Sequence, residues 1–354
     1  MTRPLRIGLI GAGANTKQRH IPGLLAQQDV VLAAVCNRRP GSTAAAAREF
    51  NIPRTFEHWR ELVAAAEIDA VVIGTWPYLH CPITLAALAA GKHVLTEARI
   101  ALNADEARRM HEAATQHPDL VTQVVPSPFG LKGHQVVLDL IESGFLGELR
   151  EVQVFGLNAS LADPAAPLHW RQDAALSGYN MLTLGILHET ISRWVPPPVR
   201  VLAQAHAFIA TRIDPASGVR RPVGTPDSVQ VLAILENGAR AIYHLSGGVT
   251  HGQHSSIWLY GTEGVLCYDL TTDRLRGASK QRSKGSASLD ELEELPIPPE
   301  KAGGWRVEEE FVRAIRHGEP VRFTTFEGGV AYMEFTEAVA HSAQSGQAVE
   351  LPLR

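Results

Sequence analysis

The segment Arg6-Ile7-Gly8-Leu9-Ile10-Gly11-Ala12-Gly13-Ala14-Asn15-Thr16 decides how the rest of this chain is interpreted. It begins as a short apolar run, which is typical of a buried strand, and continues directly into a glycine turn. Gly11 permits a tight turn that a Cβ atom would obstruct. Gly13 lets the backbone approach a pyrophosphate closely. The helix predicted next, Ile21–Gln28, would direct free N–H groups and the positive end of its dipole at that anion.

This succession of strand, turn and helix predicts a dinucleotide as the first ligand to consider. Thr16 stands where a third glycine is usual, so the motif is incomplete. A glycine-rich turn without a ligand is the alternative. The residues that we expect to contact the dinucleotide here are Gly11, Gly13, Ala14, Asn15 and Thr16.

Length and composition place the chain among globular proteins of two domains. It has 354 residues, and its 45% apolar and 20% charged residues are ordinary values. The net charge of −4 argues against a nucleic-acid partner, and no apolar run approaches the ~20 residues of a membrane span. The N-terminal residues lead directly into the first strand without a signal peptide, so we expect a cytoplasmic protein. Three widely separated cysteines predict neither a disulfide framework nor a metal site.

The first third of the chain alternates apolar strands with helices. The predicted strands are Arg6–Ile10, Val30–Cys36, Ala70–Gly74, His93–Thr96 and Leu120–Val125. The predicted helices are Ile21–Gln28, Thr43–Phe50, Glu57–Ala66, Cys81–Ala90 and Ala104–Gln116, the last with Asn103 as its N-cap. Continuous apolar strands separated by helices are typical of a doubly wound parallel sheet. We therefore expect residues 1–126 to form a dinucleotide-binding Rossmann domain.

After Pro126-Ser127-Pro128 the pattern changes to longer segments in which apolar and polar residues alternate, as in an antiparallel sheet. The predicted strands are Leu149–Leu157, Val199–Ala210, Ser228–Leu235, Ala239–Gly247, Ser255–Gly261, Gly264–Asp269 and Ala348–Leu353. The predicted helices are Lys132–Ser143, Met181–Trp194, Trp305–His317 and Glu327–Ser345, and Gly277–Pro299 is predicted to be a mobile surface loop. Residues 127–354 are thus expected to form an α/β domain with an open, mostly antiparallel sheet.

Five motifs in a fixed order resemble those of the glucose–fructose oxidoreductase and inositol dehydrogenase (Gfo/Idh/MocA) family. Gly74–His80 resembles its "TPxxxH" loop, and Ala90–Glu97 resembles "AGKHVxxE". Gly144–Leu149 resembles "GxLGxI", Trp170-Arg171 resembles the "WR" before the catalytic helix, and Phe311–Pro352 fits the closing segment. The resemblance covers nearly the whole chain. It implies a Rossmann domain, followed by an α/β domain whose open sheet joins subunits into homodimers or homotetramers.

The resemblance also implies an activity and further cofactor contacts. Members are NAD(P)-dependent oxidoreductases that act on sugars, cyclitols or related hydroxy compounds. Matching positions give cofactor contacts at Thr75, Trp76, Pro77, His80, Glu97 and Ala98, with Glu97 near the nicotinamide ribose. His80 could equally cap a helix without touching a ligand, and Trp76 could simply fill an apolar gap.

The end of the second predicted strand indicates which dinucleotide is preferred. An NAD enzyme usually has Asp or Glu there, to accept a hydrogen bond from the ribose 2′-hydroxyl. This chain has Asn37, followed by Arg38 and Arg39. A neutral side chain does not repel a 2′-phosphate, and a guanidinium binds one bidentately. We therefore predict NADP(H), with NAD(H) possible; a solvated basic turn is the alternative for the two arginines.

The usual acid–base positions of the family are all substituted. The family's Glu-Lys-Pro motif corresponds to Glu97-Ala98-Arg99, so alanine replaces the lysine. In its "GGGxxxDxGxH" motif, alignment on Gly185 places Thr183 at the aspartate and Leu187 at the histidine. Alanine, threonine and leucine cannot serve as the usual proton donors or acceptors.

Two interpretations of this substituted site remain open. In the first, the protein is an oxidoreductase whose proton is carried by His188, while Tyr179, Asn180, Glu189 and Arg171 orient a polyol or a carboxylate. In the second, it binds a dinucleotide without turnover, as a sensor or partner protein. A partly buried helix histidine bonded to a backbone carbonyl is the structural alternative for His188, and a solvated or salt-bridged helix face is the alternative for Glu189. We expect no metal, because His251 and His254 lie in a glycine-rich turn without a nearby acid.

Overall fold

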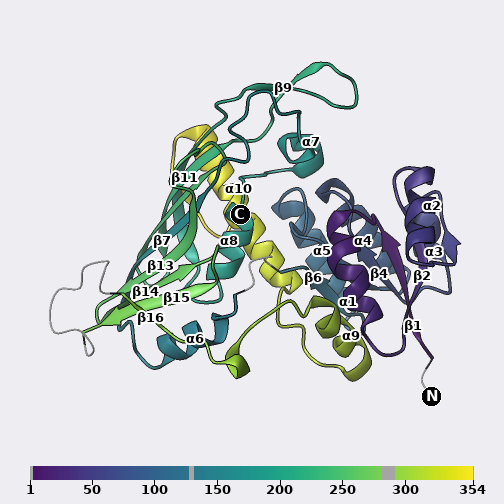
Figure 1. Cartoon of the computed structure of the whole chain (residues 1–354), viewed down its shortest axis with the longest axis horizontal. Helices are drawn as coiled ribbons and strands as arrows, with labels where there is room; N and C mark the ends of the chain where they lie inside the picture. Colours follow the sequence, from purple (N-terminus) through teal and green to yellow (C-terminus); the bar gives the residue numbers. More distant parts are fainter. Residues whose placement is uncertain (1–2, 127–130, 281–291, 354) are drawn as a thin grey trace. The chain divides into compact units, whose positions relative to one another are not determined.

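The computed structural model describes residues 3–126, 131–280 and 292–353, which divide into two compact units (Figure 1). The first unit consists of Met1–Pro126, Ala175–Gly178 and Arg306–Met333. The second consists of Ser127–Ala174, Tyr179–Trp305 and Glu334–Arg354. The sequence predicts a single division after residue 126. The structure assigns two later segments to the first unit as well, because their residues pack mainly against it.

Six parallel strands form the sheet of the first unit, in the order β3-β2-β1-β4-β5-β6. They are β1 (Leu5–Ile10), β2 (Val30–Cys36), β3 (Arg54–Thr55), β4 (Ala70–Ile73), β5 (His93–Thr96) and β6 (Thr122–Val124). Neighbouring residues of a strand point to opposite faces, yet Leu9 and Ile10 are both almost fully buried, so both faces are covered. The order reverses between β1 and β4, which confirms the predicted doubly wound sheet.

The helices of the first unit follow the predicted alternation with small changes of their ends. They are η1 (Thr16–His20, a π-helix), α1 (Ile21–Leu25), α2 (Pro40–Glu49), α3 (Trp59–Ala64), η2 (Pro77–Leu79, a 3₁₀-helix), α4 (His80–Ala89), α5 (Ala104–Gln116) and α9 (Val307–His317). Asn103 caps α5 as predicted, because its Oδ1 accepts a hydrogen bond from the backbone N–H of Glu106 (2.8 Å).

A nine-stranded mixed sheet dominates the second unit, in the order β16-β15-β14-β13-β7-β12-β11-β8-β17 (Figure 1). Its strands are β7 (Leu149–Leu157), β8 (Pro198–His206), β11 (Ser228–Leu235), β12 (Arg240–Ser246), β13 (His254–Gly261), β14 (Gly264–Asp269), β15 (Arg274–Ser279), β16 (Glu293–Glu294) and β17 (Val349–Glu350). Every neighbouring pair is antiparallel except β7 with β12. This confirms the predicted mostly antiparallel sheet. A separate two-stranded ribbon pairs β9 (Thr211–Ile213) with β10 (Arg220–Pro222).

One face of this large sheet carries the core of the second unit. The helical elements of the second unit are α6 (His134–Glu142), η3 (Trp170–Gln172), α8 (Leu184–Ile191) and η5 (Pro299–Lys301). Of α10 (Phe326–Ser345), the residues from Glu334 onward belong to this unit, and α7 (Ala174–Ser177) belongs to the first unit from Ala175 onward. Val137 of α6, Leu187 of α8 and Phe335 of α10 join buried strand residues such as Val154 in one cluster. On the other face Leu232 of β11 is 55% exposed, which shows that this face is open.

The structure corrects two predictions in the second unit. The helix expected over Met181–Trp194 is restricted to α8, because Leu182 adopts a left-handed backbone conformation (φ 57°) just before it. The stretch Gly277–Pro299, predicted to be a surface loop, contains the end of β15 and the short β16; its residues 281–291 lie outside the described part. None of the helices in the described ranges is long and apolar enough to cross a membrane.

Candidate functional site

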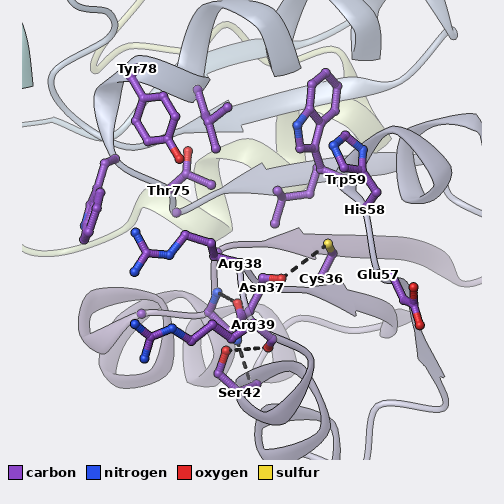
Figure 2. Close-up of a pocket in the computed structure, with 17 residues that line it drawn as sticks. Cys36, Asn37, Arg38, Arg39, Ser42, Glu57, His58, Trp59, Thr75 and Tyr78 are labelled. Atoms are coloured by element: carbon purple, nitrogen blue, oxygen red, sulfur yellow. Dashed lines mark hydrogen bonds between the residues drawn. The ribbon is translucent and has the colours of Figure 1, made fainter. Parts of the chain in front are cut away.

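A cavity of about 590 Å³ opens in the first unit where β1, β2 and β4 end (Figure 2). A volume of this size suits a cofactor or another small molecule. The residues that line it are Ile10, Gly11, Ala12, Gly13, Cys36, Asn37, Arg38, Arg39, Ser42, Glu57, His58, Trp59, Gly74, Thr75, Trp76, Tyr78 and Leu79. Strand ends at a reversal of strand order are the usual ligand site of this architecture, so the cavity is the candidate cofactor site.

The glycine turn after β1 has the geometry that a pyrophosphate requires. Gly11 has φ +91°, and a Cβ atom there would lie 2.7 Å from the carbonyl carbon of Gly74 and from the backbone nitrogen of Thr75. No larger residue fits at Gly11. At Gly13 the nearest atom to such a Cβ is the oxygen of Gly74 at 3.9 Å, so this backbone is open to a ligand. The turn therefore fits the dinucleotide predicted from the sequence.

Thr16 compensates for the absence of the third glycine. Its side chain is 2% exposed, and its hydroxyl donates a hydrogen bond to the backbone oxygen of Gly11 (3.0 Å). The space for this side chain comes from Gly74, where a Cβ atom would overlap the Thr16 hydroxyl. Thr16 also begins the π-helix η1, an irregularity that often occurs at functional sites.

Asn37 ties the glycine turn to the start of α2. Its Oδ1 accepts a hydrogen bond from the backbone N–H of Ala12 (2.6 Å), and its Nδ2 donates to the backbone oxygen of Ser42 (3.0 Å). The carboxamide is therefore held in place by neutral partners. The position that bears a carboxylate in NAD enzymes here adds no negative charge to the cavity.

Two cationic side chains follow Asn37 at the rim of the cavity. The guanidinium of Arg38 lies 5.0 Å from the centre of the Trp76 ring, a distance that allows a cation–π contact. Neither Arg38 nor Arg39 forms an ion pair with an acid in the described part of the chain. In Figure 2 both point in the same direction, whereas Glu57, an acid that also lines the cavity, lies on the other side.

Of the predicted cofactor residues, Gly11, Gly13, Asn37, Arg38, Arg39, Thr75 and Trp76 line the cavity, whereas Ala14, Asn15, Thr16, Pro77, His80, Glu97 and Ala98 do not. His80 is fully buried between two backbone carbonyls, with Nδ1 2.8 Å from the oxygen of Arg99 and Nε2 2.9 Å from that of Thr75. Burial lowers its pKa. His80 therefore links the segments that follow β4 and β5, and its side chain does not cap α4. Its role as a cofactor contact stays a prediction.

Sequence reasoning missed several residues of the cavity. Ser42 lies in the first turn of α2, and its position just after Arg38 and Arg39 is a signal that could have identified it. Glu57, His58 and Trp59 come after β3, a strand of two residues that is too short to produce a periodic pattern.

Glu97, at the end of β5, belongs to a cluster of buried charges beside the glycine turn. Its Oε1 accepts hydrogen bonds from Nε2 of His20 (3.0 Å) and from the side-chain amide of Asn15. His20 is fully buried, and its Nδ1 lies 2.6 Å from Oε1 of Glu308 in α9. The neighbouring Ala98 contributes no ionisable group, so the titratable side chains of this cluster are Glu97, His20 and Glu308.

His188, predicted to carry the proton, lies in the core of the second unit. It is 4% exposed, its Nδ1 is 2.9 Å from the hydroxyl of Tyr243, and its ring stacks on Phe335 with centroids 3.7 Å apart. Burial lowers its pKa to about 3, so the imidazole is neutral at pH 7. This placement is that of a core histidine, but its partner is a tyrosine hydroxyl and not the backbone carbonyl of the structural alternative. The catalytic role of His188 stays a prediction.

The other predicted catalytic residues are arranged in two groups. The backbone oxygen of Arg171 accepts a hydrogen bond from Nδ2 of Asn180 (2.7 Å), while the Arg171 guanidinium lies 4.3 Å from the Trp170 ring. Oδ1 of Asn180 is buried and has no hydrogen-bond partner in the described ranges. Tyr179 is half-buried, and its hydroxyl is 3.5 Å from Nε2 of His341.

Glu189, Thr183 and Leu187 are engaged in the structure of the second unit. Glu189 is buried and pairs with Arg193 one turn later, which matches the salt-bridged alternative. Leu187 is fully buried in the core, and Thr183 stands at the N-cap of α8. Within the described ranges, no three or more His, Cys, Asp or Glu side chains come together as a metal site.

Comparison with known proteins places this geometry in a family. Residues 5–124 match the "Oxidoreductase family, NAD-binding Rossmann fold", and residues 134–267 match the "GFO/IDH/MocA C-terminal domain". Levoglucosan dehydrogenase of Pseudarthrobacter phenanthrenivorans is 24% identical over 388 residues, covering 98% of each chain. The 1,5-anhydro-D-fructose reductase of Ensifer adhaerens is 27% identical over 350 residues, also covering 98% of each.

A solved structure shares the fold over the whole length. The structure of levoglucosan dehydrogenase with NADH and levoglucosan has a TM-score of 0.84 at 24% identity, covering 99% of this chain and 100% of that one. The two matched domains span most of the present chain, in the order that the sequence motifs predict. The chain therefore belongs to the Gfo/Idh/MocA family of oxidoreductases, and its N-terminal domain is the NAD-binding Rossmann domain of that family.

Proposed function

We propose that this protein transfers a hydride between NADP(H) and a hydroxyl-bearing carbon of a sugar, cyclitol or related compound. The observation that carries the proposal is the open glycine cradle at Gly11 and Gly13, which faces a cavity of about 590 Å³. The names of two relatives, levoglucosan dehydrogenase and 1,5-anhydro-D-fructose reductase, support a sugar as substrate. A bound nicotinamide would supply or accept the hydride, and the protein would bind, orient and deprotonate or protonate the substrate.

The preference for NADP(H) rests on the charge around Asn37. The carboxamide of Asn37 is held by Ala12 and Ser42, so no carboxylate stands where a 2′-phosphate would enter. Arg38 and Arg39 line the same cavity without an acidic partner in the described ranges, which leaves both available to an anion. These contacts support a 2′-phosphate site at the rim, whereas the hydroxyl of Ser42 already donates to the backbone oxygen of Arg39 (2.8 Å).

For the proton, we propose Tyr179 as the group that exchanges it with the substrate. Its hydroxyl contacts Nε2 of His341, and the same nitrogen lies 3.6 Å from Oε1 of Glu337. The His341 side chain is 43% exposed, so this chain of groups leads from a half-buried hydroxyl to solvent. Burial, with a contribution from Glu337, raises the pKa of Tyr179 and keeps its proton in place until the substrate takes it. Asn180 and Arg171 would bind substrate hydroxyls.

A non-catalytic dinucleotide-binding protein is the second candidate, favoured by Ala98, Thr183 and Leu187 at the usual acid–base positions. The two are separated by measuring cofactor affinity and then following nicotinamide absorbance over a panel of sugars, anhydro-sugars and cyclitols. We expect NADP(H) to bind more tightly than NAD(H), and at least one member of the panel to be turned over. Clear binding with no turnover on any member would favour the second candidate.

We also propose that the open face of the large sheet joins two copies of the chain. Leu202, Leu232 and Ile242 are 42%, 55% and 41% exposed and stand opposite one another on β8, β11 and β12. An apolar row of this kind is typical of an interface. We expect analytical ultracentrifugation to show a dimer or tetramer that Leu232→Arg dissociates, because the substitution would place a charge in the middle of the row. The matched variant Leu25→Arg, at an exposed leucine (53%) of the first unit, should leave the assembly intact.

A further inference from the structure

A histidine fixed between two carboxylates lies behind the glycine turn of the first unit. His20 is fully buried and contacts Glu97 through Nε2 (3.0 Å) and Glu308 through Nδ1 (2.6 Å). The three side chains come from η1, the end of β5 and the first turn of α9. The imidazole of His20 thus links η1 to α9, because its contact with Glu308 joins residues 288 positions apart.

The local backbone is shaped to admit the second carboxylate. Gly23 of α1 stands against Glu308, and a Cβ atom on Gly23 would lie 2.5 Å from Oε2 and 2.7 Å from Cδ of that glutamate. Helix interiors usually favour alanine over glycine, so this glycine costs helix stability. What it provides is the space through which Glu308, itself 2% exposed, reaches His20.

The cluster has a definite charge state at neutral pH. Burial by itself lowers the pKa of His20, but the hydrogen bonds that His20 donates to Glu308 and Glu97, together with the charges of these carboxylates, outweigh burial and raise the pKa to about 9. For Glu97, burial raises the pKa, and the hydrogen bond and charge of His20 outweigh it, so that the pKa is lowered. Asn15 donates a further hydrogen bond to Glu97, which also lowers the pKa of Glu97. Glu97 is therefore ionised beside an imidazolium.

Glu97 stands where the second half of a dinucleotide would run. The candidate cavity covers the ends of β1, β2 and β4, on the side of Asn37 and Arg38. In this architecture a dinucleotide crosses the point where strand order reverses, so its second half extends past β4 toward β5. Oε1 of Glu97 is occupied by His20 and Asn15, while Oε2 has no hydrogen-bond partner in the described ranges. That oxygen is available to accept a hydrogen bond from a ribose hydroxyl.

We propose that His20, clamped by Glu308, is the positioning residue that holds Glu97 as an oriented, charged acceptor for the nicotinamide half of the cofactor. This inference rests on the proposed function only in requiring that a nicotinamide dinucleotide binds. Glu308 fixes His20 by contacting its second ring nitrogen, and Gly23 leaves room for the Glu308 side chain to do so. The affinity for the cofactor then depends on the positive charge of His20.

The test compares Glu308→Gln with the matched control Glu309→Gln, which removes the same charge from the next residue of α9, where the carboxylate pairs with Arg306 instead. The Kd of NADPH is measured by calorimetry across a pH series, and the His20 ring is titrated by NMR. In the wild type we expect a constant Kd through neutral pH and weaker binding above about pH 9, as His20 loses its proton. In Glu308→Gln, the midpoint of the Kd profile and the midpoint of the His20 titration should both move down by about 1–3 pH units. The reason is that one of the two carboxylates that raise the pKa of His20 is gone.

Two further variants keep the inference testable if Glu308→Gln folds poorly. Gly23→Ala should displace the Glu308 carboxylate and move the midpoints in the same direction, without removing any charge. His20→Asn should weaken NADPH binding roughly 10- to 100-fold and abolish the alkaline limb of the pH profile. Unchanged midpoints in Glu308→Gln and Gly23→Ala, with the wild type binding NADPH, would overturn the positioning role alone. A wild type that binds no dinucleotide would overturn the proposed function and this inference together.

Discussion

The double variant Arg38→Ala/Arg39→Ala is expected to bind NADP(H) roughly 10²- to 10³-fold more weakly than the wild type. A hydrogen bond to a charged group contributes about 1.5–3 kcal/mol, and exposed arginines contribute at the low end of this range because water and salt screen them. Two such groups together give the stated factor. The affinity for NAD(H), which lacks the 2′-phosphate, should fall by less than about tenfold, through loss of the Arg38 contact with Trp76.

The control for this experiment is Arg60→Ala. Arg60 lies 4.4 Å from the ring of Trp59, a residue of the cavity, but Arg60 itself is not among the residues that line it. The substitution removes a cation near the site without removing a proposed phosphate ligand, so both affinities should stay within about twofold of the wild type. Fluorescence titrations of NADPH and NADH at two salt concentrations provide the measurement. Equal losses for both cofactors in the double variant would refute a 2′-phosphate site.

Asn37→Asp tests the preference for NADP(H) over NAD(H) by adding a negative charge instead of removing positive ones. The new carboxylate could still accept the hydrogen bond from Ala12, but it could no longer donate to the oxygen of Ser42. It would also repel a 2′-phosphate. We expect the ratio of NADP to NAD affinity to fall by about tenfold, with part of the loss caused by the loosened link to α2. An unchanged ratio would show that Asn37 does not face the ribose.

The first unit could be predicted well because its signals are local. Continuous apolar runs identified β1, β2, β4 and β5, and Asn103 identified the start of α5. β3 was missed because two residues cannot show a period. The place of α9 in the first unit depends on contacts between distant segments, such as that of Glu308 with His20, which no local pattern reports.

The residues of the cavity were predictable where they depend on backbone shape or follow the end of a strand. Gly11 and Gly13 are recognisable because the turn excludes a Cβ atom, and Asn37 because its strand ends at a fixed place. The burial and the protonation of His188 were not predictable, since its neighbours Tyr243 and Phe335 come from other elements of the fold. Its burial and lowered pKa follow from packing that a helical pattern does not reveal.

Tyr179→Phe is expected to lower kcat by roughly 10²- to 10⁴-fold, the usual contribution of a positioned proton donor or acceptor. Only the hydroxyl that contacts His341 is removed, and the ring still packs edge-on against it, so the fold should be retained. Cofactor affinity should not change, because the substitution leaves every residue of the cavity intact. Single-turnover kinetics measures the loss of the chemical step, and thermal unfolding checks that the fold is retained. A variant that retains full turnover would exclude Tyr179 as the proton carrier.

His188→Ala is expected to give the opposite result, a loss of stability with turnover retained. Removing the ring would leave a cavity beside Phe335 and an unpaired hydroxyl on Tyr243, which together cost about 3–5 kcal/mol of unfolding free energy. Because burial lowers the pKa of His188 from 6.5 to about 3, the unfolded chain binds its proton more readily. Its stabilising contribution is complete above about pH 6.5 and is lost as the pH falls toward about 3.

The pH dependence therefore separates the two roles of His188. The stability difference between wild type and His188→Ala, measured by urea denaturation, should be largest at neutral pH and should shrink in acid. The rate per folded molecule should keep the pH profile of the wild type, since a group with a pKa of about 3 does not titrate near neutrality. If the variant instead folds normally and loses turnover, His188 carries the proton as the sequence predicts, and Tyr179 only binds the substrate. Measured side by side, the two variants assign the proton to one residue or the other.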